Sequence, residues 1–225
     1  MTLEPLAYYH SLLGGKFGSP RQSGLVPALR GEIVFTEKYR DANALRGLEQ
    51  MSHIWLVWGF SENRSDVRGW QPTVRPPRLG GNAALGVFAT RSPYRPNPLG
   101  LSAVALERVE SGGSRGPVLH VRGADLIDGT PIYDIKPYIR YTDCLPEARS
   151  GFADAAPQPA LQVSLAPGLT LPFGAEEGEA LFQLLALDPR PAYQDDAERL
   201  YRLRFAAHDV AFRVEGNQLI ISEIN

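Results

Sequence analysis

The chain has 225 residues, of which 44% are hydrophobic and 21% charged, as is usual for a globular protein with one large or two smaller domains. No apolar run approaches the length of a membrane span, and the first residues lack the pattern of a signal peptide, so we expect a cytoplasmic protein with no membrane part. A single cysteine, Cys144, excludes an internal disulfide and any CxxC metal or redox site.

The net charge of −2 does not indicate a nucleic-acid-binding protein, but the charges are unevenly distributed. Residues 1–100 hold twelve Lys or Arg against seven Asp or Glu, and the remaining residues hold eleven against eighteen. Between Arg64 and Arg95 there are six arginines and one acid, Asp66. Such a segment can attract phosphate groups, although a solvated surface loop has the same composition.

Short segments rich in β-branched and aromatic residues dominate the first two thirds of the chain. One early helix is predicted from Ala42 to about Met51, with Asp41 as its N-cap. Strands are predicted over residues 53–60, 84–90, 101–109, 118–122 and 132–140. The Gly-rich residues 111–117 indicate a hairpin, and Asp128-Gly129 indicates a tight turn. This spacing of short strands favours an antiparallel β-barrel or sandwich.

The composition changes after Asp143, where five prolines lie among Ala, Gly and Ser residues. This is typical of a linker with room for one extended segment. A helix is predicted over residues 176–187, followed by strands over 201–205, 210–214 and 219–221, the last two joined by a turn at 215–217. We therefore predict a mainly β protein, with an antiparallel β-barrel domain over 1–145, a linker over 146–172 and a small α+β domain over 173–225.

The common motifs for nucleotides and metals do not apply. The glycine-rich residues 80–86 lie between proline-rich segments, so they cannot open a helix as a dinucleotide fingerprint must. The four histidines lack metal-ligand spacing, and we expect no metal. His53 lies in a bulky apolar run and is expected to be a core residue.

Two segments are unusually dense in polar and rigid residues. Residues 89–102 hold three prolines within six residues, and Arg91, Arg95 and Asn97 project from this stiffened loop, which is where binding sites tend to be built. Residues 125–138 combine three acids, one lysine and a tight turn. Asp128 and Thr130 either stabilise that turn through the backbone or hold a ligand with hydroxyl and amino groups; taken alone, the segment favours the turn.

Together these segments resemble the TrmO family, also called TsaA-like or YaeB-like proteins. The matching motifs are residues 16–22, 47–55, 70–78, 86–102, 125–139 and 188–193, so the resemblance covers nearly the whole chain. It implies an all-β barrel that binds S-adenosylmethionine and a homodimer. It also implies methylation of N6 in N6-threonylcarbamoyladenosine, at position 37 of threonine tRNAs.

The resemblance also implies a cofactor site and leaves the catalytic group open. The residues carried over to the cofactor site are Pro20, Arg21, Gln22, Phe60, Ser61, Arg91, Leu101, Asp128, Gly129, Thr130 and Pro131. Arg91 suits the cofactor carboxylate, Phe60 and Leu101 suit the adenine, and Asp128 suits a hydroxyl or the cationic end. The acceptor nitrogen is urea-like and must lose a proton, for which Asp128, Asp134 and Tyr133 are candidates. Tyr133 and Asp134 fit ordinary strand positions equally well.

A tRNA surface is predicted from the arginine-rich segment. Phosphate contacts are expected from Arg64, Arg68, Arg75, Arg78 and Arg95, and base stacking from Trp70 or Tyr94. Arg190 and Tyr193 either complete this surface or only cap the small domain. Two other functions stay open: a non-catalytic module that senses S-adenosylmethionine, and a methyltransferase for small molecules. A small acceptor would not need five spread arginines.

Overall fold

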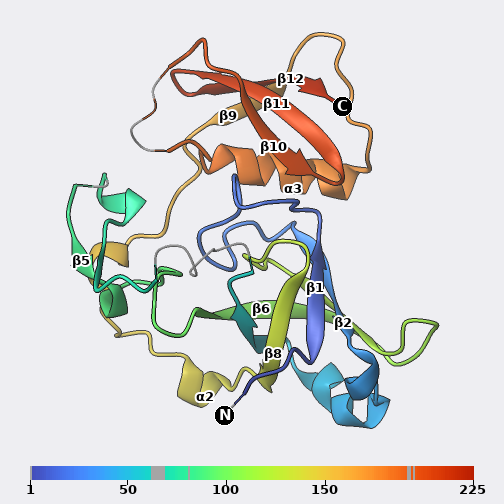
Figure 1. The fold of residues 1–225 in the computed structure, drawn as a ribbon. Coiled ribbons are helices and arrows are strands. Elements are labelled where there is room, and N and C mark those ends of the chain that lie inside the picture. Colours follow the sequence, from blue (N-terminus) through green and yellow to red (C-terminus); the bar gives the residue numbers. More distant parts are fainter. Residues whose placement is uncertain (1, 62–68, 81, 192–193, 195) are drawn as a thin grey trace.

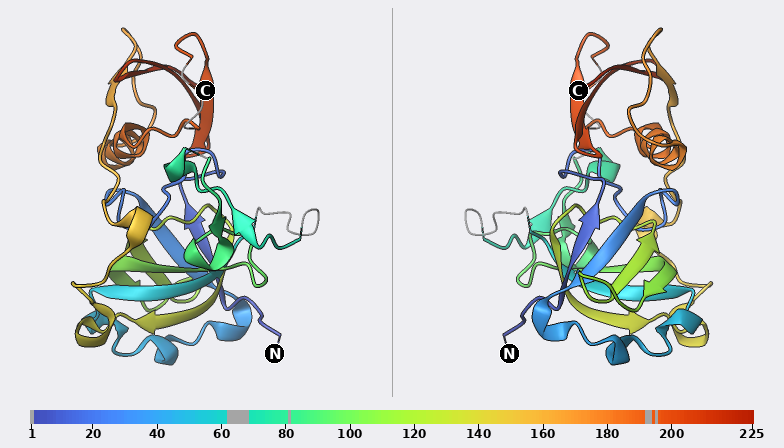
Figure 2. Two further views of the ribbon diagram at one scale, coloured as in Figure 1. Left: turned by 90° about the vertical axis from the view of Figure 1, so that its left-hand side faces the viewer. Right: turned by 90° about the vertical axis from the view of Figure 1, so that its right-hand side faces the viewer.

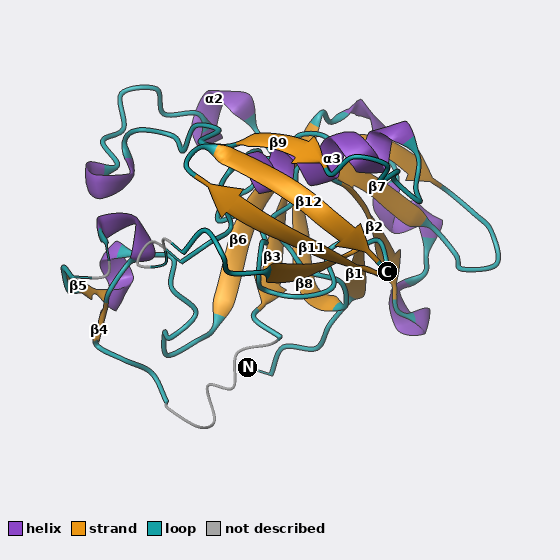
Figure 3. Cartoon of the chain, turned by 90° about the horizontal axis from the view of Figure 1, so that it is seen from above, coloured by secondary structure: helices purple, strands orange, loops and turns teal. Residues whose placement is uncertain are grey.

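The computed structural model of the chain describes residues 2–61, 69–80, 82–191, 194 and 196–225. It has two parts, a barrel and a smaller sheet that lies against one helix (Figure 1). Seen from above, the smaller sheet lies over the barrel, and strands β4 (Thr73–Val74) and β5 (Leu85–Gly86) project to one side (Figure 3). None of the described helices has both the length and the apolar content needed to cross a membrane.

Six antiparallel strands close into a barrel, which confirms the predicted architecture. In spatial order they are β1 (Ala7–Ser11), β2 (Arg30–Phe35), β7 (Val118–Arg122), β6 (Leu99–Glu110), β3 (His53–Gly59) and β8 (Thr130–Pro137). Strand β8 pairs with β1, so the sheet has no free edge. Alternate residues of β3 point inward, and Ile54, Leu56 and Trp58 join the barrel core.

The predicted hairpin and turn are also present. Strands β6 and β7 pair on either side of residues 111–117. Strand β8 begins directly after Asp128-Gly129, where Gly129 has a φ of +75°. Glycine reaches this left-handed conformation without the steric cost that a side chain brings. The chain can therefore reverse here and continue along the barrel wall.

The predicted helix over 42–51 is wrong, although its N-cap is present. The Asp41 side chain accepts a hydrogen bond from the Asn43 backbone at 2.9 Å, but only a 3-10 turn, η2 (Ala42–Leu45), follows. A second turn, η3 (Leu48–Gln50), begins after Gly47, which has a φ of +91°. A left-handed residue ends a helix, so Gly47 divides the segment into two short turns.

The predicted strand over 84–90 is also wrong. Only β5 (Leu85–Gly86) is extended, and it pairs with β4 (Thr73–Val74) outside the barrel. A 3-10 turn, η5 (Val87–Ala89), follows, in which Val87 alone is buried. The segment thus lacks the alternating burial that would hold a long strand. It instead forms part of an extension beside the barrel (Figure 2).

His53 does not belong to the core. It is exposed at the start of β3, because strand alternation turns Ile54 inward and His53 outward. Its ring lies 2.9 Å from the Ser52 hydroxyl. Other short elements are η1 (Glu37–Tyr39), η4 (Pro77–Leu79), α2 (Arg140–Asp143) and η6 (Gly151–Ala153).

The C-terminal part is a four-stranded sheet with one helix, as the predicted helix and three strands require. The strand order is β10 (Tyr201–Phe205), β11 (His208–Glu215), β12 (Gln218–Ile224) and β9 (Gln162–Leu165). Strand β9 runs parallel to β12 and comes from residues 146–172, where the sequence left room for one extended segment. Helix α3 (Ala175–Ala186) buries Ala180, Leu181, Leu184 and Leu185.

The two parts share one core at their junction. Leu13, Val26 and Leu29, from the chain around β1 and β2, are buried in the same cluster as the residues of α3 and the C-terminal sheet. The Ala206 N–H donates to the Leu12 carbonyl at 2.8 Å, which continues the pairing across the junction. Burial of these apolar side chains holds the C-terminal part in one position over the barrel.

Candidate cofactor site

A cavity of about 270 Å³ opens where the ends of β3 and β6 meet two loops of the barrel. We call it the wall cavity. Its lining residues are Pro20, Arg21, Gln22, Trp58, Phe60, Arg91, Arg95, Leu99, Gly100, Leu101 and Asp125. Barrel closure therefore brings together four segments that are far apart in the sequence, with cations, an amide and aromatic rings on one surface.

A second cavity of about 180 Å³, the inner cavity, adjoins the first. Its lining residues are Lys16, Ser19, Trp58, Phe60, Ser61, Pro93, Asp125, Leu126, Ile127 and Thr130. Trp58, Phe60 and Asp125 line both cavities. These three side chains therefore lie on the boundary between the two cavities.

A chain of hydrogen bonds fixes the floor that the two cavities share. The Trp58 indole N–H donates to the Ser102 hydroxyl at 3.0 Å, and that hydroxyl donates to Asp125 Oδ1 at 2.6 Å. Trp58 and Ser102 are only 8% and 2% exposed. The Phe60 ring packs edge-on against Trp58, with 4.5 Å between centroids. The donors are satisfied, so the rings and the carboxylate are held in defined positions.

Burial and hydrogen bonding shift the pKa of the Asp125 carboxyl in opposite directions. Burial raises its pKa above the ordinary value, because the charged form loses solvation. The hydrogen bond from Ser102, backbone N–H groups including that of Ser23, and the charge of Arg91 oppose this and lower the pKa. The balance leaves the pKa raised, so Asp125 is a stronger base than an exposed aspartate.

The arginines of the wall cavity have different roles in the structure. Arg95 donates to the Thr90 and Ser92 carbonyls at 2.9 and 3.3 Å, and therefore braces the proline-stiffened loop. Arg91 donates to the Gln22 side-chain oxygen and is otherwise exposed. A guanidinium placed beside aromatic and apolar side chains suits a ligand with a carboxylate at one end and a flat ring at the other.

The structure brings most of the predicted cofactor residues together. Those lining the wall cavity are Pro20, Arg21, Gln22, Phe60, Arg91 and Leu101. Ser61 and Thr130 line the inner cavity, and the Thr130 hydroxyl also donates to the Ile127 carbonyl at 2.7 Å. This bond is the turn stabilisation that the sequence favoured. Asp128, Gly129 and Pro131 are not among the described lining residues of either cavity.

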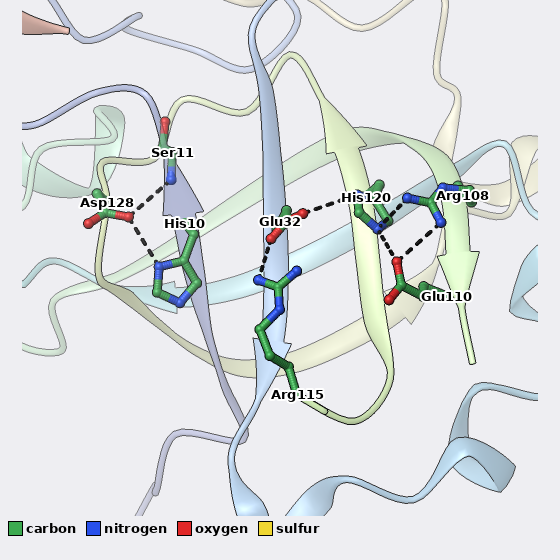
Figure 4. A network of polar contacts seen from close by, with 8 residues as sticks. All are labelled: His10, Ser11, Glu32, Arg108, Glu110, Arg115, His120 and Asp128. Carbon is green, nitrogen blue, oxygen red and sulfur yellow. Dashed lines mark hydrogen bonds and ion pairs between the residues drawn. The ribbon is translucent and has the colours of Figure 1, made fainter. Parts of the chain in front are cut away.

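Asp128 faces a different part of the barrel. Its Oδ1 accepts a hydrogen bond from the Ser11 backbone at 3.1 Å and lies 3.2 Å from His10 Nδ1 (Figure 4). A hollow of about 350 Å³ lies beside His10, where Arg30 pairs with Glu107 at 2.8 Å and with Glu176 of α3. The ion pair to α3 links the barrel to the C-terminal part.

The same outer face of the barrel carries a network of charged side chains that satisfy one another (Figure 4). Arg115 donates to Glu32 at 2.6 Å, and this bond holds the pKa of the Glu32 carboxyl below its ordinary value. His120 lies 3.1 Å from Glu110 Oε2, and the contact lowers the pKa of the Glu110 carboxyl. Because these charged side chains pair with one another, the network needs no ligand to balance its charges.

The other two catalytic candidates, Tyr133 and Asp134, lie on β8. The Tyr133 ring packs so closely over Gly59 that an added Cβ there would lie 2.7 Å from it. Asp134 pairs with Lys136 at 2.8 Å and accepts a hydrogen bond from the Ile135 backbone. Neither is among the described lining residues of the wall or inner cavity. Their contacts are those of ordinary strand residues.

A larger groove of about 940 Å³ connects the site to the C-terminal part. This junction groove runs past residues 150–157 and the end of α3, and it shares Arg21, Gln22 and Arg91 with the wall cavity. Phe17, Phe88 and Phe152 line it and are 37%, 74% and 37% exposed. Aromatic rings and cations along one groove are suited to unpaired bases and phosphates.

The predicted tRNA residues lie in different places around this groove. Arg78 lines it and donates to the Ala155 carbonyl, while Arg75 is exposed nearby in the chain. Tyr94 is half-buried, and its carbonyl accepts from the Gln71 N–H at 3.0 Å. Arg190 forms an ion pair with Asp188 at 2.8 Å. Arg64, Arg68 and Tyr193 lie outside the described residues.

Sequence reasoning did not select Asp125, Trp58 and Ser102 as site residues. Asp125 begins one of the two dense segments, but Asp128 is the acid that the turn motif marks. Ser102 is a hydroxyl within an apolar strand, which is a weak sign of a buried partner. The bonds join residues 44 and 23 positions apart, so only the closed barrel reveals them.

Comparison with known proteins gives matches along almost the whole chain. The family model of the tRNA-methyltransferase O N-terminal domain matches residues 8–144, and the TrmO C-terminal domain model matches residues 170–225. A tRNA (adenine(37)-N6)-methyltransferase of Escherichia coli is 42% identical over 207 residues, covering 88% of this chain and 87% of the relative.

Two further matches extend this result. A putative S-adenosylmethionine-dependent methyltransferase RcsF of Pseudomonas aeruginosa is 40% identical, covering 97% of this chain and 95% of the relative. A crystal structure of TrmO superimposes with a TM-score of 0.76 at 33% identity, covering 100% of this chain and 98% of that one. Both the barrel and the C-terminal part are therefore shared with these proteins.

Proposed function

The chain belongs to the TrmO family of tRNA methyltransferases, and we propose that it transfers a methyl group from S-adenosylmethionine to N6 of the adenosine at position 37 of tRNA. More specifically, we propose that this adenosine is N6-threonylcarbamoyladenosine and that the substrates are threonine tRNAs. The observation that supports the activity best is the wall cavity, where Arg91, Gln22, Phe60 and Leu101 line one surface.

The residues of the two cavities fit the proposed cofactor. Its amino-acid carboxylate is met by Arg91, with Arg21 beside it, and its adenine by Phe60 and Leu101. Ser61 and Thr130 of the inner cavity offer hydroxyl groups to the ribose or the amino group. The Asp128–Pro131 turn contributes Thr130 to the lining of the proposed site. When bound, the cofactor supplies an activated methyl group on a good leaving group.

The chain's own contribution to the reaction is mainly positioning. Fixing two reactants in line removes much of the entropic barrier to a bimolecular step. The floor of Trp58, Ser102 and Asp125 and the loop braced by Arg95 hold the walls of the site in place before any substrate arrives. The rings of Trp58 and Phe60 line both cavities and give their shared boundary an apolar surface.

The junction groove is the proposed route for the tRNA. Phe88 and Phe152 offer faces for unpaired bases next to the target, and Arg78 and Lys16 offer charge to the backbone. An arginine near the site also suits the threonyl carboxylate of the modified base. Family resemblance further supports a homodimer, and we propose that the protein works in the cytoplasm, where tRNA is modified.

Nucleoside mass spectrometry tests the proposed function. Purified protein is incubated with the cofactor and with tRNA from cells that lack this protein but retain threonylcarbamoylation. We expect threonylcarbamoyladenosine to gain one methyl group, and no gain on transcripts that carry plain adenosine at position 37. Cofactor binding with no methyl on either tRNA would favour a sensing module, and methylation of small nucleosides alone would favour a small-molecule enzyme.

Replacing Arg75 and Arg78 together by alanine is expected to weaken tRNA binding about tenfold at moderate salt. It should also reduce the slope of log affinity against log salt by about 1 to 2, because two phosphate contacts are lost. Fluorescence anisotropy across a salt series measures both the affinity for tRNA and its dependence on salt. The matched control replaces Arg202 and Arg213, two exposed arginines of the C-terminal sheet. Equal slopes in the two variants would contradict a role for Arg75 and Arg78.

A further inference from the structure

We propose that Asp125 is the base that takes the proton from the acceptor nitrogen during methyl transfer. The inference rests on the proposed function, and it assigns a role to a residue that is not among the site residues predicted from the sequence. It follows from where Asp125 lies, from what else lines the site, and from how its carboxylate is held.

Asp125 lines both of the cavities that we propose to hold the cofactor. The proposed cofactor residues are divided between the wall cavity, with Arg91 and Leu101, and the inner cavity, with Ser61 and Thr130. Trp58, Phe60 and Asp125 line both cavities. A methyl donor that uses both sets of residues would therefore have the Asp125 carboxylate beside it.

No other side chain at this place can accept a proton near neutral pH. Among the described residues that line the two cavities, Asp125 is the one carboxylate, and none is a histidine, cysteine or tyrosine. The remaining polar groups are cations, hydroxyls and the Gln22 amide. The sequence candidates Asp128, Asp134 and Tyr133 have their contacts elsewhere on the barrel.

The step is balanced without any further reactant. The N–H bond of the acceptor breaks and its proton goes to the Asp125 carboxylate, while the electron pair stays on nitrogen. That pair forms the new bond to the methyl carbon as the carbon–sulfur bond breaks, and its electrons remain on sulfur. A urea-like nitrogen is a poor nucleophile until it loses this proton, so a base in contact with it accelerates transfer.

The surroundings of Asp125 make its carboxylate a stronger base than that of an exposed aspartate. Burial raises the pKa of its carboxyl, whereas the hydrogen bond from Ser102 lowers it. The charged and titratable groups around it are Arg21, Arg91 and Arg95 of the wall cavity, Lys16 of the inner cavity, and Tyr9 of β1. The charge of Arg91 favours the carboxylate, whereas burial favours the neutral acid, and the net effect is a raised pKa.

Asp125→Asn is the first test, because the amide keeps the shape and an oxygen for Ser102. We expect turnover on tRNA to fall by about 10² to 10⁴, the range for loss of a general base. Calorimetry should give cofactor affinity within about threefold of wild type, with little change in Tm. Asp209→Asn, an exposed aspartate in β11, is the matched control and should match wild type in all three measurements.

The possible outcomes separate this inference from the proposed function. If wild-type protein transfers no methyl group to tRNA, the proposed function fails, and the inference with it. If wild type and Asp125→Asn are equally active, only the inference fails. A loss of affinity that equals the loss of turnover would make Asp125 a cofactor ligand and would also overturn it.

Ser102→Ala provides a second test that holds even if Asp125→Asn does not fold. Removing the Ser102 hydroxyl removes a hydrogen bond that lowers the pKa of Asp125. The acid limb of the kcat–pH profile should therefore move to higher pH, because the base is protonated earlier as pH falls. An acid limb at the wild-type position would overturn the role of Asp125.

Discussion

Replacing Gly100 by alanine is expected to abolish cofactor binding and to lower the stability of the barrel. Gly100 lies on β6 directly over Trp58, and a Cβ at this position would lie 2.2 Å from the indole Cε2. Atoms cannot approach so closely, so the Trp58 ring must move. Because Trp58 is buried and forms part of both cavities, its displacement fills the site and breaks the bond to Ser102.

The size of the effect follows from overpacking. Inserting a methyl group into a packed core costs about 1–3 kcal/mol, which lowers Tm by several degrees in a chain of this size. Cofactor affinity should fall more than about a hundredfold, since the cavity itself changes shape. Calorimetry with S-adenosylhomocysteine and thermal unfolding measure the two effects. Gly112→Ala is the control, because a Cβ there meets nothing within 4 Å; wild-type affinity in Gly100→Ala would refute the proposed location of the site.

Replacing Arg91 by alanine should have the second large effect, a loss of cofactor affinity without a loss of stability. Arg91 is exposed at the mouth of the wall cavity, where it donates to the Gln22 side chain. A charge-assisted hydrogen bond to a carboxylate contributes about 1.5–3 kcal/mol, or about ten- to a hundredfold in Kd. Arg91→Lys keeps the charge but not the bidentate geometry of the guanidinium. Its affinity for the cofactor should therefore lie between those of wild type and Arg91→Ala.

The control for Arg91 is Arg115→Ala. Arg115 is also exposed and bonded to a side-chain oxygen, that of Glu32, but it lies on the outer face of the barrel (Figure 4). We expect wild-type cofactor affinity in this variant, measured by the same titration. If Arg91→Ala and Arg115→Ala bind the cofactor equally well, Arg91 does not contact the carboxylate.

Much of the fold follows from local patterns in the sequence. Segments rich in β-branched and aromatic residues and a Gly-rich hairpin turn predict β3, β6 and β7, and the Asp128-Gly129 pair predicts the turn before β8. The errors arose where one residue overrides a pattern: Gly47 divides an expected helix, and the 84–90 segment has only Val87 to bury. The apolar neighbours of His53 predict a buried side chain, but strand alternation turns it outward.

The site was less accessible to sequence reasoning than the fold. The proline-rich loop and residues 20–22 stand out as motifs, and they do line one cavity. The floor of that cavity does not stand out, because Trp58, Ser102 and Asp125 meet only when β3, β6 and the segment before β8 close the barrel. Asp128 could be recognised as a turn residue, but its partner His10 lies 118 positions away.

A crystal structure with S-adenosylhomocysteine would test most directly whether the paired hollows in the barrel wall hold the methyl donor. The account predicts electron density across the wall and inner cavities, with the ligand carboxylate at Arg91, the adenine against Phe60 or Leu101, and the sulfur beside Asp125. Density confined to the hollow beside His10 and Arg30, with both of these cavities empty of ligand, would contradict it.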